Sequence, residues 1–328
     1  MNRDDSPAGR EDLRPFSIIG LGTIVVDHMV AVDGFPERDT KNEISEHWFQ
    51  VGGPVPTALA AVNRLGGRSA FLGRWANDHL GAMIEEDLRA EGIAFDAPAC
   101  EADSQTGFAH VWVERDSGRR TSVFHRGSHE IEGSGFDGAE LANHDALHLD
   151  GWSTAAAIKA ARAMRAKGGA VFLDLGSPKE RLAELLSEVE VVNCPLRCVE
   201  RVFGETDPVA GARKLIVAGP RLVTVTDGEN GAWLVSETTQ LHCPAFEIEP
   251  VDTNGAGDTF CGALIYAVMQ GWDEPRVLRF ATAAAALKCG GLGNRAALPD
   301  LDAVGGALER SAATVDRISE SPSGNCSA

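Results

Sequence analysis

The sequence predicts an α/β fold in three layers, with a mainly parallel central sheet and a small β-rich lid. Between Ala146 and Thr226, short apolar runs of strand length alternate with segments of helical periodicity. This alternation is typical of a parallel sheet that is covered by helices on both faces. Residues 42–51, 107–114 and 120–125 have strand character but do not fit the alternation. They suggest a small antiparallel sheet beside the main one, placed so that it could act as a lid.

The main elements are expected in a regular order along the chain. Phe16 opens a buried strand with Asp27 just beyond its end, and a Gly52-Gly53 turn precedes an Ala-rich helix. Turn residues such as Asp116-Ser117-Gly118 separate the elements. Strands are expected at residues 16–26, 70–72, 147–149, 171–174, 189–192 and 222–226, and helices at residues 51–65, 78–91, 154–167, 179–187, 209–218 and 259–269.

Composition points to one large globular domain, expected at residues 15–318. Apolar residues make up 44% of the 328 residues and charged residues 24%, which is ordinary for a globular protein. The formal net charge of −18 argues against nucleic acid as a partner, because phosphate backbones require clustered Lys and Arg. Residues 1–14 and 319–328 are polar, and we expect both ends to be disordered.

Cysteine usage and the apolar runs bear on the compartment. The seven cysteines are odd in number and scattered, so we expect reduced thiols in a cytoplasmic protein. The chain starts with polar residues rather than an apolar leader, and no uncharged apolar run reaches about 18 residues. We therefore expect neither a signal peptide nor a membrane span.

The segment from Asp252 to Asp258 is the strongest candidate for catalysis. It reads Asp-Thr-Asn-Gly-Ala-Gly-Asp and leads into the apolar segment Thr259 to Met269, which predicts a buried helix. Small residues at a helix start let a ligand approach the backbone. The first amides of a helix have no internal acceptor and suit a phosphate or a developing anion. Asp258 would stand beside that anion, where it can accept a proton from an attacking hydroxyl group.

Other polar residues follow strands of the predicted sheet. In open α/β sheets, ligands gather at the carboxyl ends of the strands. The residues expected there are Asp27, Asp150, Asp174, Asn193 and Thr226 with the loop that follows it. The sequence has no Gly-x-x-x-x-Gly-Lys-Ser/Thr phosphate loop and no complete dinucleotide fingerprint, so those nucleotide-binding modes are excluded.

Asp252 to Asp258 resembles the late signature of the PfkB family of ribokinase-like carbohydrate kinases. Gly52-Gly53 resembles the early signature, and the element order agrees over roughly residues 16–310. Thr226-Asp227-Gly228-Glu229-Asn230-Gly231 is similar to the family's Thr-x-Gly-x-x-Gly loop. The resemblance implies a ribokinase-like fold with lid segments near 27–51 and 107–126. It also implies an ATP-dependent sugar kinase and, by analogy, a homodimer formed through the lid.

The same resemblance implies roles for individual residues. Asp258 would be the general base, with the amides of Gly255, Ala256 and Gly257 forming the anion hole. Mg²⁺ would bridge the phosphates of ATP. The residues implied to bind the sugar are Asp27, Gly52, Gly53, Thr57 and Asp150. Those implied to bind the nucleotide are Asn193, Thr226, Gly228, Gly231, Gly257 and Thr282. A potassium-like ion would lie at Asp252, Asn254 and the loop from Cys289 to Gly293.

The chain departs from the family pattern at several places. Pro54 and Thr57 stand where many sugar-binding members carry Asn, as in the sulfofructose kinase branch, and His148 to Gly151 resembles ketohexokinase. Leu196 replaces the Glu of the Asn-x-x-Glu element that organises Mg²⁺. Arg126, Lys41 and His125, on the lid segments, are candidates for contact with an anionic group. A nucleoside kinase and a catalytically silent sugar sensor are the alternative functions.

Overall fold

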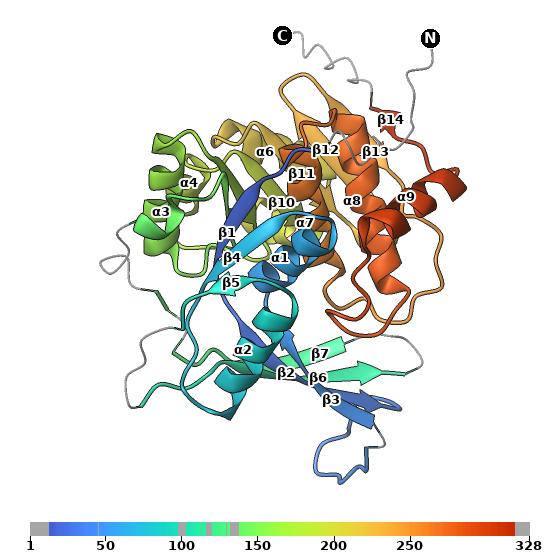
Figure 1. Ribbon diagram of the computed structural model, residues 1–328. Coiled ribbons are helices and arrows are strands. Elements are labelled where there is room, and N and C mark those ends of the chain that lie inside the picture. Colours follow the sequence, from blue (N-terminus) through green and yellow to red (C-terminus); the bar gives the residue numbers. More distant parts are fainter. Residues whose placement is uncertain are drawn as a thin grey trace, which may run out of the picture.

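A ten-stranded sheet forms the centre of the computed structural model (Figure 1). Its seven strands from β11 to β5 pair in parallel, and β12, β13 and β14 extend one edge in antiparallel fashion. In spatial order the strands are β14 (Asp316–Arg317), β13 (Gln240–Cys243), β12 (Ala232–Ser236), β11 (Leu222–Thr226), β10 (Val191–Pro195), β9 (Ala170–Asp174), β8 (Ala146–Leu149), β1 (Ser17–Leu21), β4 (Arg68–Leu72) and β5 (Ala94–Phe95). The expected mainly parallel sheet is confirmed.

The structure describes residues 13–44, 46–97, 103–115, 120–128, 130–131 and 138–318. Most of the two ends that were expected to be disordered, 1–14 and 319–328, lies outside these ranges. The expected hairpin turn at 116–118 also lies outside them.

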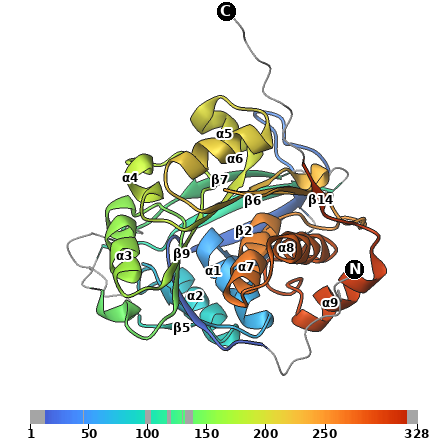
Figure 2. The ribbon, with the colours of Figure 1, turned by 90° about the horizontal axis from the view of Figure 1, so that it is seen from above.

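Helices cover both faces of the sheet, as Figure 2 shows from above. Their bounds are α1 (Pro54–Arg64), α2 (His79–Ala90), α3 (Thr154–Ala166), α4 (Leu182–Leu186), α5 (Leu196–Phe203), α6 (Pro208–Val217), α7 (Ala256–Met269), α8 (Glu274–Cys289) and α9 (Leu301–Arg310), with short 3₁₀ turns η2 (Ala139–Leu141) and η3 (Gly228–Asn230). On β1, Ile18 packs into the core beneath α1, α7 and α8, whereas Ile19 packs into the core beneath α3 and α6. This alternation follows from the two-residue period of a strand, so two apolar cores sandwich one sheet.

A second, four-stranded sheet forms the lid, in the order β3 (Glu46–Gly52), β2 (Val25–Val32), β6 (Phe108–Glu114) and β7 (Arg120–His125). The expected small antiparallel sheet is a mixed one, because β2 and β6 pair in parallel. Between these two strands the chain passes through β3, α1, β4, α2 and β5 and re-enters the lid in the same direction. Only Gly22–Ile24 separates β1 of the main sheet from β2 of the lid.

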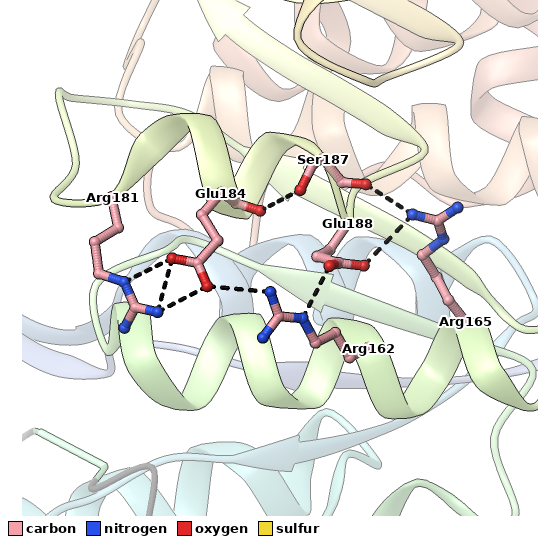
Figure 3. A network of polar contacts seen from close by, with 6 residues as sticks. All are labelled: Arg162, Arg165, Arg181, Glu184, Ser187 and Glu188. Atoms are coloured by element: carbon pink, nitrogen blue, oxygen red, sulfur yellow. Dashed lines mark hydrogen bonds and ion pairs between the residues drawn. The ribbon is translucent and has the colours of Figure 1, made fainter.

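Ion pairs join α3 to the segment around α4 on the outside of the molecule (Figure 3). Arg162 contacts Glu184 at 3.1 Å and Glu188 at 2.9 Å, and Arg181 pairs with Glu184 at 2.7 Å. Exposed pairs of this kind each contribute less than about 1 kcal/mol. Their joint effect is to fix α4, and with it the loop that follows β9, against α3.

Five cysteines lie in the described part of the chain and are free thiols: Cys194, Cys198, Cys243, Cys261 and Cys289. Within the described ranges, no helix combines the length and the apolar character that crossing a membrane would require.

Candidate active site

The start of α7 presents backbone amides around Gly257. The helix is capped by Gly255, whose φ of +78° favours glycine, and a Cβ there would lie 3.0 Å from Asn294 Oδ1. The first i to i−4 bond runs from the Thr259 amide to the Gly255 carbonyl at 2.9 Å. The amides of Ala256, Gly257 and Asp258 therefore precede the helical bonding pattern, and a Cβ on Gly257 would meet no atom within 4 Å. Open space thus adjoins donors at the positive end of a helix.

Asp258 lies on this first turn of α7 and is partly exposed. Its surroundings nevertheless remove enough water to raise the pKa of its carboxyl group, while four positive charges oppose that rise. These charges are Arg120, Arg295, Arg197 and Lys288, in decreasing order of effect. Arg120 comes from the lid and Arg197 from α5, so cations from separate elements surround the carboxylate.

Asp27 extends toward the same site from β2 of the lid. Burial raises the pKa of Asp27 to about 6, and the negative charge of Asp258 adds to the rise. Gly52 makes room for this carboxylate, because a Cβ on Gly52 would lie 2.4 Å from Asp27 Oδ2. Gly53 has a φ of +112°, and its Cβ would collide with the Thr23 carbonyl at 2.3 Å. Gly52 is therefore required by the packing of Asp27, and Gly53 by its backbone conformation and the close approach of Thr23.

Asp150 follows β8 and is fixed by two backbone amides. Its Oδ2 accepts from the Thr23 amide at 2.7 Å and its Oδ1 from the Trp152 amide at 3.0 Å. Gly22 leaves room here, since its Cβ would lie 2.7 Å from Asp150 Oδ2. Burial raises the pKa of Asp150, and the hydrogen bonds from these amides oppose the rise.

Asp174 and Asn193 form a buried polar pair at the ends of β9 and β10. The Asn193 amide group donates to Asp174 Oδ1 at 3.1 Å, and Thr224 donates to Asn193 Oδ1 at 3.0 Å. Burial, together with the nearby negative charge of Asp258, raises the pKa of Asp174 well above its ordinary range. Carboxylates that repel one another in this way fit a site for a hard divalent cation such as Mg²⁺. From the sequence, Asp174 was expected only at the end of a strand, and no part in binding a divalent cation was assigned to it.

The expected nucleotide loop follows β11. Thr226 is the last residue of that strand, and Gly228 opens η3 with a φ of +50° and open space at its Cβ. Gly231 has a φ of +87°, and its Cβ would lie 2.1 Å from the Cys243 carbonyl. Thr282 is buried in α8, where its hydroxyl donates to the Leu278 carbonyl at 2.8 Å. Its hydroxyl is thus used within its own helix, and its role beside adenine stays a prediction.

The Thr57 side chain is fully buried, and its hydroxyl group is hydrogen-bonded to a neighbouring side chain instead of facing open space. Its Oγ1 accepts from Arg295 Nη1 at 3.0 Å, and Arg295 Nε also donates to Asp87 at 3.1 Å. Arg295 in turn acts on both Asp27 and Asp258. The sequence assigned no role to Arg295 or Arg120, because side chains so far apart in the chain converge only when the fold is formed.

The Lys288 side chain binds a backbone carbonyl at the site where a monovalent cation was expected. Its side chain is fully buried, and its Nζ donates to the Asp252 carbonyl at 2.7 Å and lies 3.3 Å from Asp252 Oδ2. The Asp252 carboxylate also accepts from the amides of Asn254 at 2.8 Å and Gly293 at 2.9 Å. Because an ammonium group already holds this carbonyl, the residues present do not fit a potassium-like ion bound to it.

Known proteins share extended sequence similarity with this chain. The chain is 27% identical over 286 residues to the ketohexokinase of Mus musculus, covering 83% of this chain and 96% of that protein. It is 27% identical over 293 residues to an ATP-dependent ribose-1-phosphate kinase of Halopiger xanaduensis, covering 88% of this chain and 96% of that protein.

Solved structures share the fold. The Arabidopsis thaliana ribokinase complexed with ribose and ATP superposes with a TM-score of 0.79 at 24% identity, covering 91% of this chain and all of that chain. A putative ribokinase II from E. coli in complex with ATP and Mg²⁺ gives a TM-score of 0.78 at 22% identity, covering 90% of this chain and all of that chain. The family model described as pfkB family carbohydrate kinase matches residues 17–301. The chain therefore belongs to the pfkB family of carbohydrate kinases, and its fold is ribokinase-like.

Proposed function

We propose that this chain transfers the γ-phosphoryl group of ATP to a hydroxyl group of a sugar or sugar derivative, with Asp258 as the general base. The observation that carries the proposal is the first turn of α7, where a carboxylate with a raised pKa lies beside Gly257, whose Cβ position is open space at the positive end of the helix. A base and an anion site so close together meet the main demands of phosphoryl transfer, which are positioning and charge stabilisation.

Different groups accept the proton and stabilise the negative charge in this proposal. Asp258 accepts the proton of the sugar hydroxyl, for which a raised pKa is suited. The amides of Gly255, Ala256 and Gly257 hold the oxygens of the transferring group, and Arg120 and Arg197 approach from the lid and from α5. Mg²⁺, when bound with ATP, would neutralise phosphate charge, and Asp174 with Asn193 is the pair that would hold it and its waters.

The sugar is proposed to lie between the lid and the carboxyl ends of β1 and β8. Asp27 and Asp150 would accept its hydroxyl groups, and Gly52 and Gly53 would let it approach the backbone. Thr57 would act through Arg295. Closure of the lid would exclude water, and lid-to-lid pairing of two chains would give the homodimer that the resemblance implies.

ATP is proposed to lie on the opposite side of Asp258, along the ends of β10 and β11. Asn193, Thr226, Gly228 and Gly231 border this region, and Gly257 faces the γ-phosphate. Thr282 lies farther along, at the adenine end. The E. coli ribokinase II complex, which contains ATP and Mg²⁺, supports the choice of nucleotide and metal.

Lys288 is proposed to supply the charge that a potassium-like ion was expected to supply. Its ammonium group holds Asp252 and ties the Asp252–Asp258 segment to the loop after α8. Turnover would then be independent of K⁺, and Asp252 and Asn254 would anchor the loop rather than bind a metal ion.

Release of ADP across a panel of sugars tests the proposal. The panel should include fructose, ribose, sulfofructose, sugar acids and nucleosides, and also ribose 1-phosphate because one relative is named for it. We expect at least one sugar to stimulate ADP release in the wild type but not in Asp258→Asn. Binding of a sugar without ADP release would instead indicate a silent sensor, and stimulation by nucleosides alone would indicate a nucleoside kinase.

A further inference from the structure

Two cations share one indole ring at the edge of the proposed sugar site. The Arg126 Cζ lies 3.5 Å from the centroid of the Trp152 ring, and the Lys179 Nζ lies 3.7 Å from it. Two groups this close to the ring centroid would overlap if they lay over the same face, so they lie over opposite faces of the ring. Arg126 follows the last lid strand, Trp152 follows β8 and Lys179 follows β9, so three segments build this cation stack. Such contacts are attractive for each cation, but the two positive charges repel each other.

Among the described residues, neither cation of the stack forms an ion pair with a carboxylate, although Asp150 and Asp174 act on Lys179 electrostatically. Among the residues that the structure describes, the Arg126 side chain contacts only the rings of Phe124 and Trp152. Lys179 uses one of its three donors, toward Ser177 Oγ at 2.9 Å. Asp150, which attracts Lys179 electrostatically, already accepts from two backbone amides.

Burial makes this arrangement costly. Lys179 is half-buried, and loss of water lowers the pKa of its ammonium group despite the nearby carboxylates. Gly151 permits the close approach, since its Cβ would lie 3.3 Å from Lys179 Cγ, and its φ of +73° favours glycine. The ion pairs of Arg162 on α3 with Glu184 and Glu188 fix the segment that follows Lys179. Two like charges are thus held together, in a chain whose net charge is −18.

The positive charges of the site fall into two groups. Those that act on Asp258 are Arg120, Arg295, Arg197 and Lys288, and Arg120 and Arg197 among them are proposed to approach the phosphoryl group that is transferred. Lys179 instead acts on Asp150, on the side where the sugar is proposed to lie, and on Asp174 at the end of the neighbouring strand β9. A second group of cations at the sugar side is superfluous for a neutral sugar, whereas it suits a sugar that carries an anion.

We propose that the cation stack of Arg126, Trp152 and Lys179 binds an anionic group on the sugar substrate, at the end away from the hydroxyl that is phosphorylated. The guanidinium and ammonium groups lie over the two faces of the indole, and both keep donors that can bind the oxygens of an anion. Because Arg126 belongs to the lid, the anion also draws the lid toward the main domain. This inference rests on the proposed sugar kinase activity and specifies its substrate class.

Steady-state kinetics with matched substrate pairs provide the test. Each neutral sugar is compared with its anionic counterpart: ribose with ribose 1-phosphate, fructose with fructose 6-phosphate, and fructose with sulfofructose. We expect kcat/KM to favour an anionic member at least tenfold, and the phosphate and sulfonate arms identify the preferred anion. In Arg126→Gln and Lys179→Gln, the KM for that substrate should rise about ten- to hundredfold with little change in kcat. Values for neutral sugars should stay within about twofold.

Arg181→Gln is the matched control, because it removes an exposed cation of the same segment that pairs with Glu184 outside the site. It should leave both KM values unchanged. Equal effects of Arg126→Gln on neutral and anionic sugars, or a preference of the wild type for the neutral members, would overturn the inference while leaving the sugar kinase proposal intact.

Calorimetric binding separates failure of the inference from failure of the proposed function. If no sugar releases ADP, the kinase proposal fails, and titration with the same sugar phosphates still decides the anion site. Binding to the wild type that is lost in the Arg126→Gln, Lys179→Gln double variant supports it, and absence of binding or equal binding to both proteins refutes it. Thermal unfolding of each variant verifies that it is folded.

Discussion

The Nζ of Lys288 lies 2.7 Å from the main-chain carbonyl oxygen of Asp252, at the start of the segment that ends in Asp258. The carboxylate of Asp252 is 3.3 Å from the same ammonium group. The carbonyl, the carboxylate and the amides of Asn254 and Gly293 thus form one bonded cluster at the start of the Asp252–Asp258 segment, and the ammonium group of Lys288 supplies its positive charge.

Replacing Lys288 with Met should make the enzyme depend on added cations. The substitution leaves a buried carbonyl without its donor, which costs about 1–3 kcal/mol of stability, and it loosens the segment that carries Asp258. We expect kcat to fall, and K⁺ or NH₄⁺ to restore part of it at matched ionic strength, whereas tetramethylammonium should not. Activity of the wild type should be the same in all three salts.

Lys167→Met is the control for a lysine that holds carbonyl oxygens elsewhere. Lys167 Nζ donates to the carbonyls of Leu141 at 2.6 Å and Ala142 at 3.0 Å, away from the site. Its replacement should lower stability without introducing any cation dependence of kcat. Strong activation of the wild type by K⁺ would contradict the role given to Lys288.

Gly257→Ala should keep or raise stability while lowering kcat/KM for ATP. A methyl group on Gly257 meets no protein atom within 4 Å, and alanine is favoured over glycine in a helix by up to about 1 kcal/mol. The protein should therefore be as stable as the wild type or more so. The same methyl group stands in the space proposed for the phosphoryl group, so kcat/KM for ATP should fall at least tenfold. Gly305→Ala in α9, where a Cβ also meets nothing, should stabilise the protein and leave its kinetics unchanged.

Asp258→Asn should remove catalysis while keeping the nucleotide site. Asn keeps the shape of the side chain but cannot accept the proton of the sugar hydroxyl, so we expect turnover to fall by about two to four orders of magnitude. Affinity for ATP, measured by calorimetry, should change little, since the amides of α7 are intact. Near-normal turnover in this variant would exclude Asp258 as the base.

Asp27→Asn should change stability in a pH-dependent way. Burial raises the pKa of Asp27 from 3.8 to about 6, so between these values the folded protein binds more protons than the unfolded chain. The free energy of unfolding then falls as the pH rises through this window, by up to about 3 kcal/mol for this group. Asp27→Asn has no carboxyl group at this position to ionise, so its free energy of unfolding does not fall in this way. In chemical denaturation, the free energy of unfolding of Asp27→Asn should equal that of the wild type near pH 4 and should exceed it most above pH 6. A difference that stays constant with pH would contradict the assignment.

The same substitution bears on the substrate. Ionised Asp27 accepts from sugar hydroxyl groups more strongly than the protonated acid does. The KM of the wild type for its sugar should therefore decrease as the pH rises through about 6. The KM of Asp27→Asn should be higher, and it should lack this dependence.

Much of the fold could be predicted from the sequence because it depends on local patterns. The alternation of apolar strands and helices predicted the parallel sheet, and Gly255 with its small neighbours predicted the start of α7. The pairing of the lid could not be predicted in the same way. The parallel register of β2 and β6 depends on the path of the chain between Val32 and Phe108 through the main domain, and no local turn signal encodes that path.

The site shows the same division. Asp150 and Asp258 were found because the first follows a strand and the second lies at the start of a helix. Asp27 was expected just beyond a strand at 16–26, but that strand ends at Leu21 and Asp27 lies within β2 of the lid. Arg120 and Arg295 act on two of these carboxylates, but they reach the site from segments whose meeting depends on tertiary packing. Lys288 was given no role in the site either, because a lysine near the end of a helix usually faces solvent.

The three residues between β1 and β2 have a mechanical consequence. Gly22, Thr23 and Ile24 are the whole covalent link at that point between the main sheet and the central lid strand, and the Thr23 amide is bonded to Asp150 Oδ2 at 2.7 Å. The pivot of the lid and the anchor of a proposed substrate-binding carboxylate are therefore one element. A movement of the lid would therefore either turn about this bonded amide or displace the carboxylate, which links the position of the lid to the geometry of Asp150.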